Sequence, residues 1–388
     1  MPKPPVSQPQ VARGRSASRA GPLPQPRLRI CELVLAPAVG GAETLALTLA
    51  ASLREAGHAV DVIALDGPRG EASLSTGEIR VAERPRWAKG ERLGRLTAAR
   101  LLAMSGRYDV IHAHSYLPNL YARAGAASSR TRLPVVVTLL SGSDDFATHS
   151  ARRVEACLAP WTSAVVAMGE RLQNEYREYF PKLRDRVRVI HVGVHREPFV
   201  ERDLGKPTRF ALVGRVTPQK DLETAIRGFA PFAEAAGDPP VTLSIIGPPS
   251  DAEYARRMHL LADTLARDSV SFVGARANPF ADEKIDVLVH SAVSEAHTPI
   301  AILEAAGRGI PVICRDSGSM ADAIGWHCTT FADGSPEHLT RALLQVRNDW
   351  PQAIRRARLA WEIVPRFDDT ARRYEALLTA VADPRSAS

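Results

Sequence analysis

The segment SEAHTPIAILEA, residues 294–305, places Glu295 and Glu304 on opposite sides of a Thr-Pro pair and an apolar run. Further apolar residues follow Glu304, so it stands within the longer run IAILEAA, where a carboxylate without a partner would be costly. We therefore expect Glu304 to accept hydrogen bonds from ribose hydroxyls and Glu295 to hold sugar hydroxyls. The plainer interpretation is an N-cap carboxylate for Glu295 and a solvated helix residue for Glu304.

The Thr-Pro pair indicates where the helix of this segment begins. Pro299 suits a first helical turn, because its missing N–H would have no partner there. The amides of Thr298, Ile300 and Ala301 would then lie near the helix N-terminus, which is a natural binding site for an anion.

A second segment with chemical potential is FALVGRVTPQKDLET, residues 210–224. A strand is predicted to end at Gly214, and Arg215 and Lys220 follow in the loop before a helix that Asp221 could cap. Two cations at a strand end suit a diphosphate, which arginine binds through its planar fork and lysine as a point charge. The alternative is that both are ordinary surface bases, but their position at the strand end favours phosphate binding.

A glycine pair, Gly40 and Gly41, lies between the first predicted strand and the first predicted helix. Glycine lets the backbone turn sharply and approach a ligand, with helix amides pointing at it. The pattern is not GxGxxG, so it does not favour a nicotinamide site. A purely structural turn is the alternative.

These segments need elements to position them, and short runs of Val, Ile and Leu alternate with helical windows along the chain. The runs are 28–35, 59–65, 108–112, 134–140, 163–168, 187–194, 209–214, 241–246, 270–273, 286–290 and 311–314. Most are apolar throughout, which is typical of parallel strands covered on both faces. Between two of them, Leu45, Leu49 and Leu53 recur every fourth residue and predict an amphipathic helix. The sequence thus predicts a doubly wound α/β fold.

The polar segment 195–208 separates two strand–helix series. It predicts one Rossmann-like domain at 28–200 and another at 201–365, with a C-terminal helix and tail at 366–388. Two such domains would leave a cleft between the carboxyl ends of their strands. Residues 1–27 carry charge and proline but no apolar stretch, so we expect a disordered basic leader, not a secretory signal.

From about residue 28 the chain resembles the retaining GT-B glycosyltransferases of family 4. The matching segments, in order, are GGAE, DVIHAHS, VIHVGV, GRVTPQKDLETAI, SEAHTPIAILEA and GRGIPVI, followed by FDDTARRYEALLTAV. The last of these resembles the C-terminal helix that crosses back onto the first domain in that family. Their order and spacing are more specific than any one of them.

The resemblance implies a role for each of the segments described above. Arg215 and Lys220 would clamp the diphosphate of a nucleotide-sugar donor, and Glu304 would bind its ribose. Glu295 would face the donor sugar, while Gly41 would contact donor phosphate or sugar from the first domain. The implied reaction is transfer with retention of configuration, in which the leaving phosphate takes the proton of the acceptor.

The chain departs from the family pattern in two places. Eight residues separate Glu295 from Glu304, where the family usually has seven, so one inserted residue must be absorbed in the loop. The family commonly shows a histidine near the reacting sugar in a pattern like TxHG, whereas this chain reads TLLSGSD. We expect Asp144 or His114 to contribute there instead.

We expect the reaction to need no metal ion and no cofactor, because cations and helix amides can neutralise the leaving diphosphate. The sequence contains no DxD motif. His112 and His114, two residues apart, are expected to be a strand-end pair and not metal ligands.

The net charge of +7 is unevenly distributed. Residues 1–29 carry six bases and no acid, and residues 80–107 carry eight bases and two acids. The remainder is therefore not basic, which argues against nucleic acid as a partner. The window 91–107 fits a core-packed helix with a solvated basic face, or an interfacial helix that presents Trp87 and arginines to anionic lipid.

No apolar run approaches the roughly 20 residues of a membrane span. We expect a cytoplasmic protein, placed peripherally on the inner face of the membrane if the interfacial interpretation holds. That interpretation suits a lipid-linked acceptor, and the core-packed one suits a polar acceptor.

The sequence thus predicts a hexosyltransferase-type enzyme that uses a nucleotide sugar, with a UDP- or GDP-sugar as the expected donor. The missing histidine motivates a second hypothesis, a non-catalytic nucleotide-sugar-binding partner or degraded homologue. A third is a sugar-nucleotide epimerase of the same architecture, which would convert the donor without an acceptor.

Overall fold

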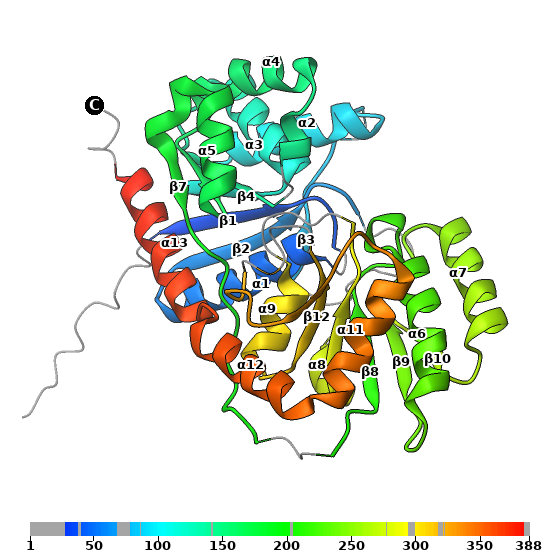
Figure 1. Ribbon diagram of the computed structural model, residues 1–388. Coiled ribbons are helices and arrows are strands. Elements are labelled where there is room, and N and C mark those ends of the chain that lie inside the picture. The colour runs from blue at the N-terminus through cyan, green and yellow to red at the C-terminus, as the bar shows by residue number, and fades with distance from the viewer. Residues whose placement is uncertain are drawn as a thin grey trace, which may run out of the picture.

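The computed structural model describes residues 28–37, 40–67, 78–85, 87–140, 143–201, 205–276, 278–293, 299–316, 321 and 323–383, excluding the side chains of residues 143 and 144. Two parallel β-sheets with helices on both faces form the molecule (Figure 1). The predicted pair of Rossmann-like doubly wound domains is confirmed. The predicted leader, residues 1–27, lies outside the described residues.

The first sheet has the strand order β3-β2-β1-β4-β5-β6-β7. Its strands are β1 (Arg29–Val34), β2 (Ala59–Ala64), β3 (Ile79–Val81), β4 (Val110–His114), β5 (Val135–Leu139), β6 (Ala164–Ala167) and β7 (Val187–Val189). The helices of this half are α1 (Gly41–Glu55), α2 (Glu91–Met104), α3 (Tyr116–Ser129), α4 (His149–Leu158) and α5 (Glu170–Tyr179).

The second sheet has the order β10-β9-β8-β11-β12-β13. Its strands are β8 (Arg209–Val213), β9 (Thr242–Ile246), β10 (Val270–Gly274), β11 (Val287–His290), β12 (Val312–Arg315) and β13 (Thr329–Phe331). The helices are α6 (Leu222–Ala236), α7 (Ala252–Leu265), α8 (Pro279–Asp282), α9 (Ile300–Gly307), α11 (Pro336–Asn348) and α12 (Trp350–Ile363).

The apolar runs predicted most strands, but missed β3 and β13 and lengthened β7. Both missed strands have three residues and lie at a sheet edge. Such short elements carry almost no periodicity, so only pairing with a neighbour defines them. The run predicted at 187–194 is a strand only over Val187–Val189.

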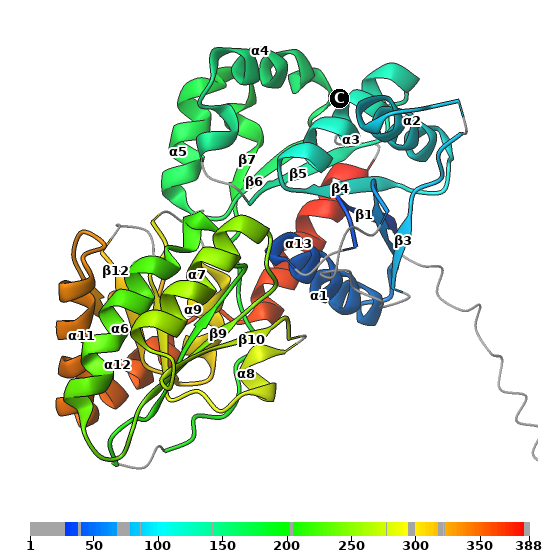
Figure 2. The same ribbon diagram turned by 90° about the vertical axis from the view of Figure 1, so that its right-hand side faces the viewer.

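Helices pack on both faces of the first sheet. The predicted stripe of Leu45, Leu49 and Leu53 is buried on α1. On the same face, α13 (Phe367–Ala382) packs on α1 and β4 and contributes the fully buried Tyr374. Figures 1 and 2 show α13, in red, leaving the second half of the chain to lie along this sheet.

The chain passes between the two domains twice, and the two passages lie side by side. Val194 donates its N–H to the carbonyl of Pro365 at 3.0 Å and accepts from the N–H of Phe367 at 3.1 Å. The hydroxyl of Thr370 accepts from the N–H of Gly193 at 2.8 Å and donates to the carbonyl of His191 at 2.8 Å. These bonds tie the linker to the start of α13.

Among the described residues, no helix combines the length and apolarity that crossing a membrane would require.

We call the place where the linker contacts the start of α13 the hinge. Gly193→Ala should destabilise it, because a Cβ at residue 193 would lie 2.3 Å from the carbonyl atoms of Arg366. Overpacking of this kind costs about 1–3 kcal/mol. The free energy of unfolding, measured by urea denaturation, should fall by that amount. Gly67→Ala is the matched control, since a Cβ at Gly67 meets nothing within 4 Å. Equal stability of the two variants would contradict this account of the hinge.

Candidate active site

The order of the strands reverses once in each sheet, between β1 and β4 and between β8 and β11. In doubly wound folds, ligands bind outside the carboxyl ends of the strands at such reversals. The segments with Gly40, with Arg215 and with Glu304 follow β1, β8 and β11, and His114 ends β4; these four strands flank the reversals, whereas Asp144 follows β5. The fold therefore directs these segments to the ligand-binding edge of each sheet.

After β8, the loop from Gly214 to Lys220 presents the two predicted cations. Gly214 adopts φ +150°, and a Cβ there would lie 2.9 Å from Cε and 3.3 Å from Nζ of Lys220. The lysine side chain thus lies over the glycine, a position that a larger residue would block. Arg215 is exposed and Lys220 is half-buried.

Asp221 fixes this loop to its surroundings. It caps α6 as predicted, accepting from the N–H of Thr224 at 3.3 Å and from the Thr224 hydroxyl at 2.7 Å. Arg315, at the end of β12, forms an ion pair with the same carboxylate. The hydroxyl of Ser291 donates to the carbonyl of Lys220 at 2.8 Å. Ser291 and Arg315 were not predicted, because nothing in their local sequence links them to residues 70 or more positions away.

The second-domain helix α9 begins at Ile300, with Pro299 as its N-cap residue. The N–H groups of Ile302 and Leu303 bond to the carbonyl of Pro299, at 3.0 and 3.2 Å. Among the backbone hydrogen bonds of the described residues, none has the N–H of Ile300 or Ala301 as donor. These two amides stand at the helix N-terminus, where N–H groups lack an intrahelical partner and can face a ligand.

Glu304 lies one turn into α9 and is half-buried. Burial raises the pKa of its carboxyl above the ordinary value, and the charge of Arg308 acts in the opposite direction. Within the described part of the chain, its carboxylate makes no hydrogen bond or ion pair. A desolvated carboxylate without a partner is costly, which is the situation of a group that a ligand completes.

The start of α1 brings the first domain against this site. A Cβ on Gly41 would lie 3.0 Å from Cδ1 of Ile300, so the first turns of α1 and α9 touch. Gly40 is the N-cap of α1, where a Cβ would clash with the carboxylate of Glu43 at 2.6 Å. Burial raises the pKa of Glu43, and the nearby charge of Arg215 opposes that rise. The acid of GGAE therefore interacts electrostatically with a predicted phosphate-binding cation, a pairing that the sequence did not indicate.

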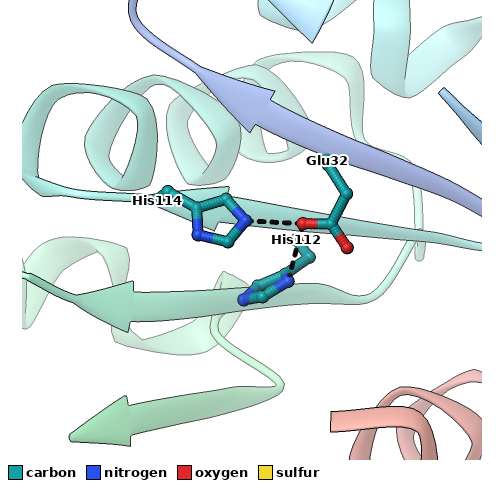
Figure 3. A group of neighbouring side chains, drawn as sticks. All are labelled: Glu32, His112 and His114. Atoms are coloured by element: carbon teal, nitrogen blue, oxygen red, sulfur yellow. Dashed lines mark hydrogen bonds and ion pairs between the residues drawn. The ribbon is translucent and has the colours of Figure 1, made fainter. Parts of the chain in front are cut away.

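His114 ends β4 and is completely buried (Figure 3). Its Nε2 lies 2.5 Å from Oε2 of Glu32, and Nδ1 of His112 lies 2.9 Å from the same oxygen. Burial alone would raise the pKa of Glu32, but the two histidines lower it to about 2. Burial and His112 lower the pKa of His114 to about 4, against the pull of Glu32. His114 is thus a neutral interior ring beside an ionised carboxylate.

Ser115, directly after His114, is backbone-strained. It has φ 72° and ψ 170°, a region that is nearly restricted to glycine and costs on the order of 1–3 kcal/mol. Its N–H bonds to the carbonyl of Thr138 at 3.1 Å, and the side-chain amide of Asn119 donates to the same oxygen at 2.9 Å. Strain of this kind gathers at functional positions, and here it sets the direction in which the chain leaves β4.

The described residues thus bring together Gly40, Gly41, Arg215, Lys220, Pro299, Ile300 and Glu304 around the two reversals. Glu295 and Thr298 lie outside the described residues, as does the side chain of Asp144. The roles assigned to these three stay predictions.

Two open cavities lie at the hinge, away from this site. One, of about 320 Å³, lies between the linker at Val194–Pro198 and the start of α13. The other, of about 390 Å³, is lined by residues of the same passages, including His191 and Arg373. Neither is lined by a predicted site residue, and both are explained by the crossing of the chain between domains.

Comparison with protein families gives two adjacent matches. The model for Glycosyltransferase Family 4 matches residues 39–197, and that for Glycosyl transferases group 1 matches residues 195–360. The boundary between them falls in the linker. No curated protein sequence matches the chain significantly.

Solved structures share the fold at low sequence identity. HepE of Anabaena, in complex with UDP and glucose, is 18% identical with a TM-score of 0.75, covering 91% of this chain and 99% of HepE. Sucrose-phosphate synthase of Thermosynechococcus elongatus is 16% identical with a TM-score of 0.71, covering 93% and 100%. WaaG, a glycosyltransferase involved in lipopolysaccharide biosynthesis, is 15% identical with a TM-score of 0.68, covering 90% and 99%.

Two consecutive family matches, two doubly wound domains and the meeting of their helix N-termini agree with one another: the chain belongs to the GT-B glycosyltransferases, as a Family 4 domain followed by a group 1 domain.

Proposed function

We propose that this glycosyltransferase transfers a hexose from a nucleotide sugar to an acceptor hydroxyl, with retention of anomeric configuration and without a catalytic metal ion. The observation that carries the proposal is the half-buried Glu304 carboxylate, which has no hydrogen bond or ion pair among the described residues and lies one turn inside α9, whose N-terminal amides lack intrahelical partners. A donor supplies both complements, hydroxyls for the carboxylate and a diphosphate for the amides.

The diphosphate would lie between the loop after β8 and the start of α9. Arg215 is exposed for bidentate binding of phosphate, and Lys220 adds a charge held over Gly214. Glu43 faces the same arginine from the first domain. Without a donor, Glu43 would balance the charge of Arg215, and a bound phosphate would replace Glu43 in that interaction.

The negative charge that develops on the leaving diphosphate would be stabilised by these cations and by the amides of α9. Preorganised charges and dipoles of this kind can supply the largest part of a rate enhancement. Retention would follow if the leaving phosphate takes the proton of the acceptor hydroxyl on the same face. Glu295 and Asp144 are proposed to position the sugar, whereas His114, being sealed in the interior, supports the end of β4.

We propose a UDP-sugar as the donor, ahead of a GDP-sugar. The support is that HepE, which shares the fold over nearly the whole chain, was solved with UDP and glucose. The ribose contact proposed for Glu304 is the same for either nucleotide, so it does not separate them.

A second proposal concerns the acceptor side, where α2 and the residues flanking it present apolar and basic side chains together. Trp87, Leu93, Leu101 and Met104 are 68%, 46%, 43% and 54% exposed. Exposed bases lie among them, namely Lys89, Arg92, Arg100 and Arg107. The purely core-packed interpretation of this helix does not account for its exposed leucines. We propose that this surface binds anionic lipid and so delivers a lipid-linked acceptor.

The donor proposal is tested by thermal-shift and hydrolysis assays with UDP-, GDP- and dTDP-sugars in metal-free buffer. We expect stabilisation by a UDP-sugar with slow release of UDP. Lys220→Ala should weaken UDP binding about 10- to 150-fold, since a hydrogen bond to a charged group contributes about 1.5–3 kcal/mol.

Lys206→Ala, the control, removes an exposed lysine that precedes β8 at the opposite end of the strand and should bind as the wild type does. Equal affinity of the two variants would remove the clamp assignment. Stabilisation without turnover, even with acceptors, would favour the non-catalytic partner. Conversion of the donor without an acceptor would favour the epimerase.

Donor binding should depend on pH through Glu304. Burial raises the pKa of Glu304, so its carboxylate is lost as pH falls through a value above the ordinary pKa of glutamate. UDP affinity, measured by calorimetry from neutral pH downward, should therefore decline earlier than UDP ionisation alone explains. Glu304→Gln should bind more weakly at neutral pH and lack this extra decline. The same pH profile in both proteins would show that Glu304 does not contact the donor.

Vesicle sedimentation tests the lipid surface. Arg92→Gln combined with Arg100→Gln should lower partitioning onto phosphatidylglycerol vesicles roughly thirtyfold, because each base near an anionic surface contributes ~1 kcal/mol. The matched control replaces Arg256 and Arg267, which are also exposed and belong to the second domain. Equal losses in both double variants would indicate unspecific attraction, and no binding by the wild type would refute the proposal.

A further inference from the structure

The buried cluster of Glu32, His112 and His114 is not used by the proposed transfer reaction. Glu32 lies on β1, and both histidines lie on the neighbouring strand β4 (Figure 3). All three side chains have no exposed surface. Figure 3 shows the two rings turned toward one carboxylate from the same side of the sheet. That side is the one covered by α1 and α13.

Some polar atoms of this cluster have no hydrogen-bond partner among the described residues. Nδ1 of His112 and Nε2 of His114 both converge on Oε2 of Glu32, at 2.9 and 2.5 Å. Oε1 of Glu32 and Nδ1 of His114 have no hydrogen-bond partner among the described residues. Buried polar atoms without hydrogen-bond partners are costly, and a cation shared by the carboxylate and the two rings would lower that cost.

We propose that Glu32, His112 and His114 bind one divalent metal ion, Zn²⁺ by the chemistry of the ligands. Two imidazole nitrogens and a carboxylate oxygen form a common zinc ligand set. The three ligand atoms lie within 4.8 Å of one another. Zinc bonds of about 2.0–2.1 Å in tetrahedral geometry place ligand atoms about 3.3 Å apart. His112 is close to that separation, and His114 would recede by less than about 1 Å.

The surroundings of His112 resemble the second layer of a metal site. Its Nε2 lies 2.8 Å from the hydroxyl of Thr138, which in turn lies 3.1 Å from the hydroxyl of Tyr374 on α13. Metal-bound histidines usually donate their other N–H to such a partner, which fixes the tautomer and the ring orientation. With Nε2 on Thr138, Nδ1 of His112 is left facing Glu32, as the metal requires.

The ion would be structural. It would join β1 to β4 beneath α13, and its burial gives no access to a substrate. It is therefore separate from the leaving diphosphate, and the proposal of metal-free transfer does not depend on it. Metal ligands must be deprotonated, so zinc retention should fall at acidic pH.

Metal analysis of the full chain tests the proposal. The protein is purified without chelator or histidine tag, loaded with equimolar Zn²⁺, desalted and analysed by mass spectrometry. The wild type should retain about one zinc ion per chain, as a structural site does. Glu32→Gln, which keeps the shape of the side chain, and His114→Ala should lose it. Thr138→Val should weaken zinc affinity about 10- to 100-fold, as second-layer changes do.

His58→Gln is the matched control, because His58 is also buried in the first domain and contacts Glu375 of α13 at 3.2 Å. It should retain zinc. The visible absorption spectrum of the wild type loaded with Co²⁺ should be that of a tetrahedral ion with nitrogen and oxygen ligands. This measurement does not depend on whether a variant folds. A wild type that holds no zinc after loading would overturn the proposal and leave a proton-sharing ion pair. Equal zinc loss in His58→Gln would also overturn it.

Discussion

The reversal of strand order in each sheet is the constraint on which the rest of the molecule depends. The connections that leave β1 and β4 run in opposite directions along the sheet, as do those that leave β8 and β11. The loops at the carboxyl ends of these strands are therefore not covered by crossover helices. Each sheet thus has one edge region where backbone and polar side chains can meet a ligand. The two domains are joined where the chain passes between them at Val194 and at Arg366. This connection places the two edge regions opposite each other. The contact of Gly41 with Ile300 is the result.

Charge at that meeting point is held in place by bonds that lie outside it. Asp221 caps α6 and pairs with Arg315, so the loop carrying Lys220 is anchored from two directions. Glu304 has the opposite character, since burial raises its pKa and no described side chain forms a hydrogen bond or ion pair with its carboxylate. The anchored groups can stabilise developing charge without first reorganising, whereas the unpartnered group gains most when a ligand arrives. This division of roles suits an enzyme that must bind and release a donor in every cycle.

The sequence predicted the features that depend on local pattern. Runs of Val, Ile and Leu identified the long strands, and the loops after two of them, β1 and β8, were recognised by glycine, arginine and lysine at strand ends. It did not predict features that depend on register. Glu32 and His112 are 80 positions apart and become neighbours only through the pairing of β1 with β4. The short edge strands β3 and β13, the strain at Ser115 and the Asp221–Arg315 pair are likewise products of tertiary contacts.

The interior of the first domain explains why a cation there would matter to the whole enzyme. Tyr374 belongs to the helix that crosses from the second domain, and its hydroxyl reaches His112 through Thr138. An ion at Glu32 would therefore stabilise the strand that ends at Ser115 and the helix that ties the domains together. For the two domains to close on a donor, the end of β4 and helix α13 must keep fixed positions relative to each other. A buried carboxylate is costly without a partner. A bound ion would remove that cost and would stabilise the region where β4 and α13 are joined.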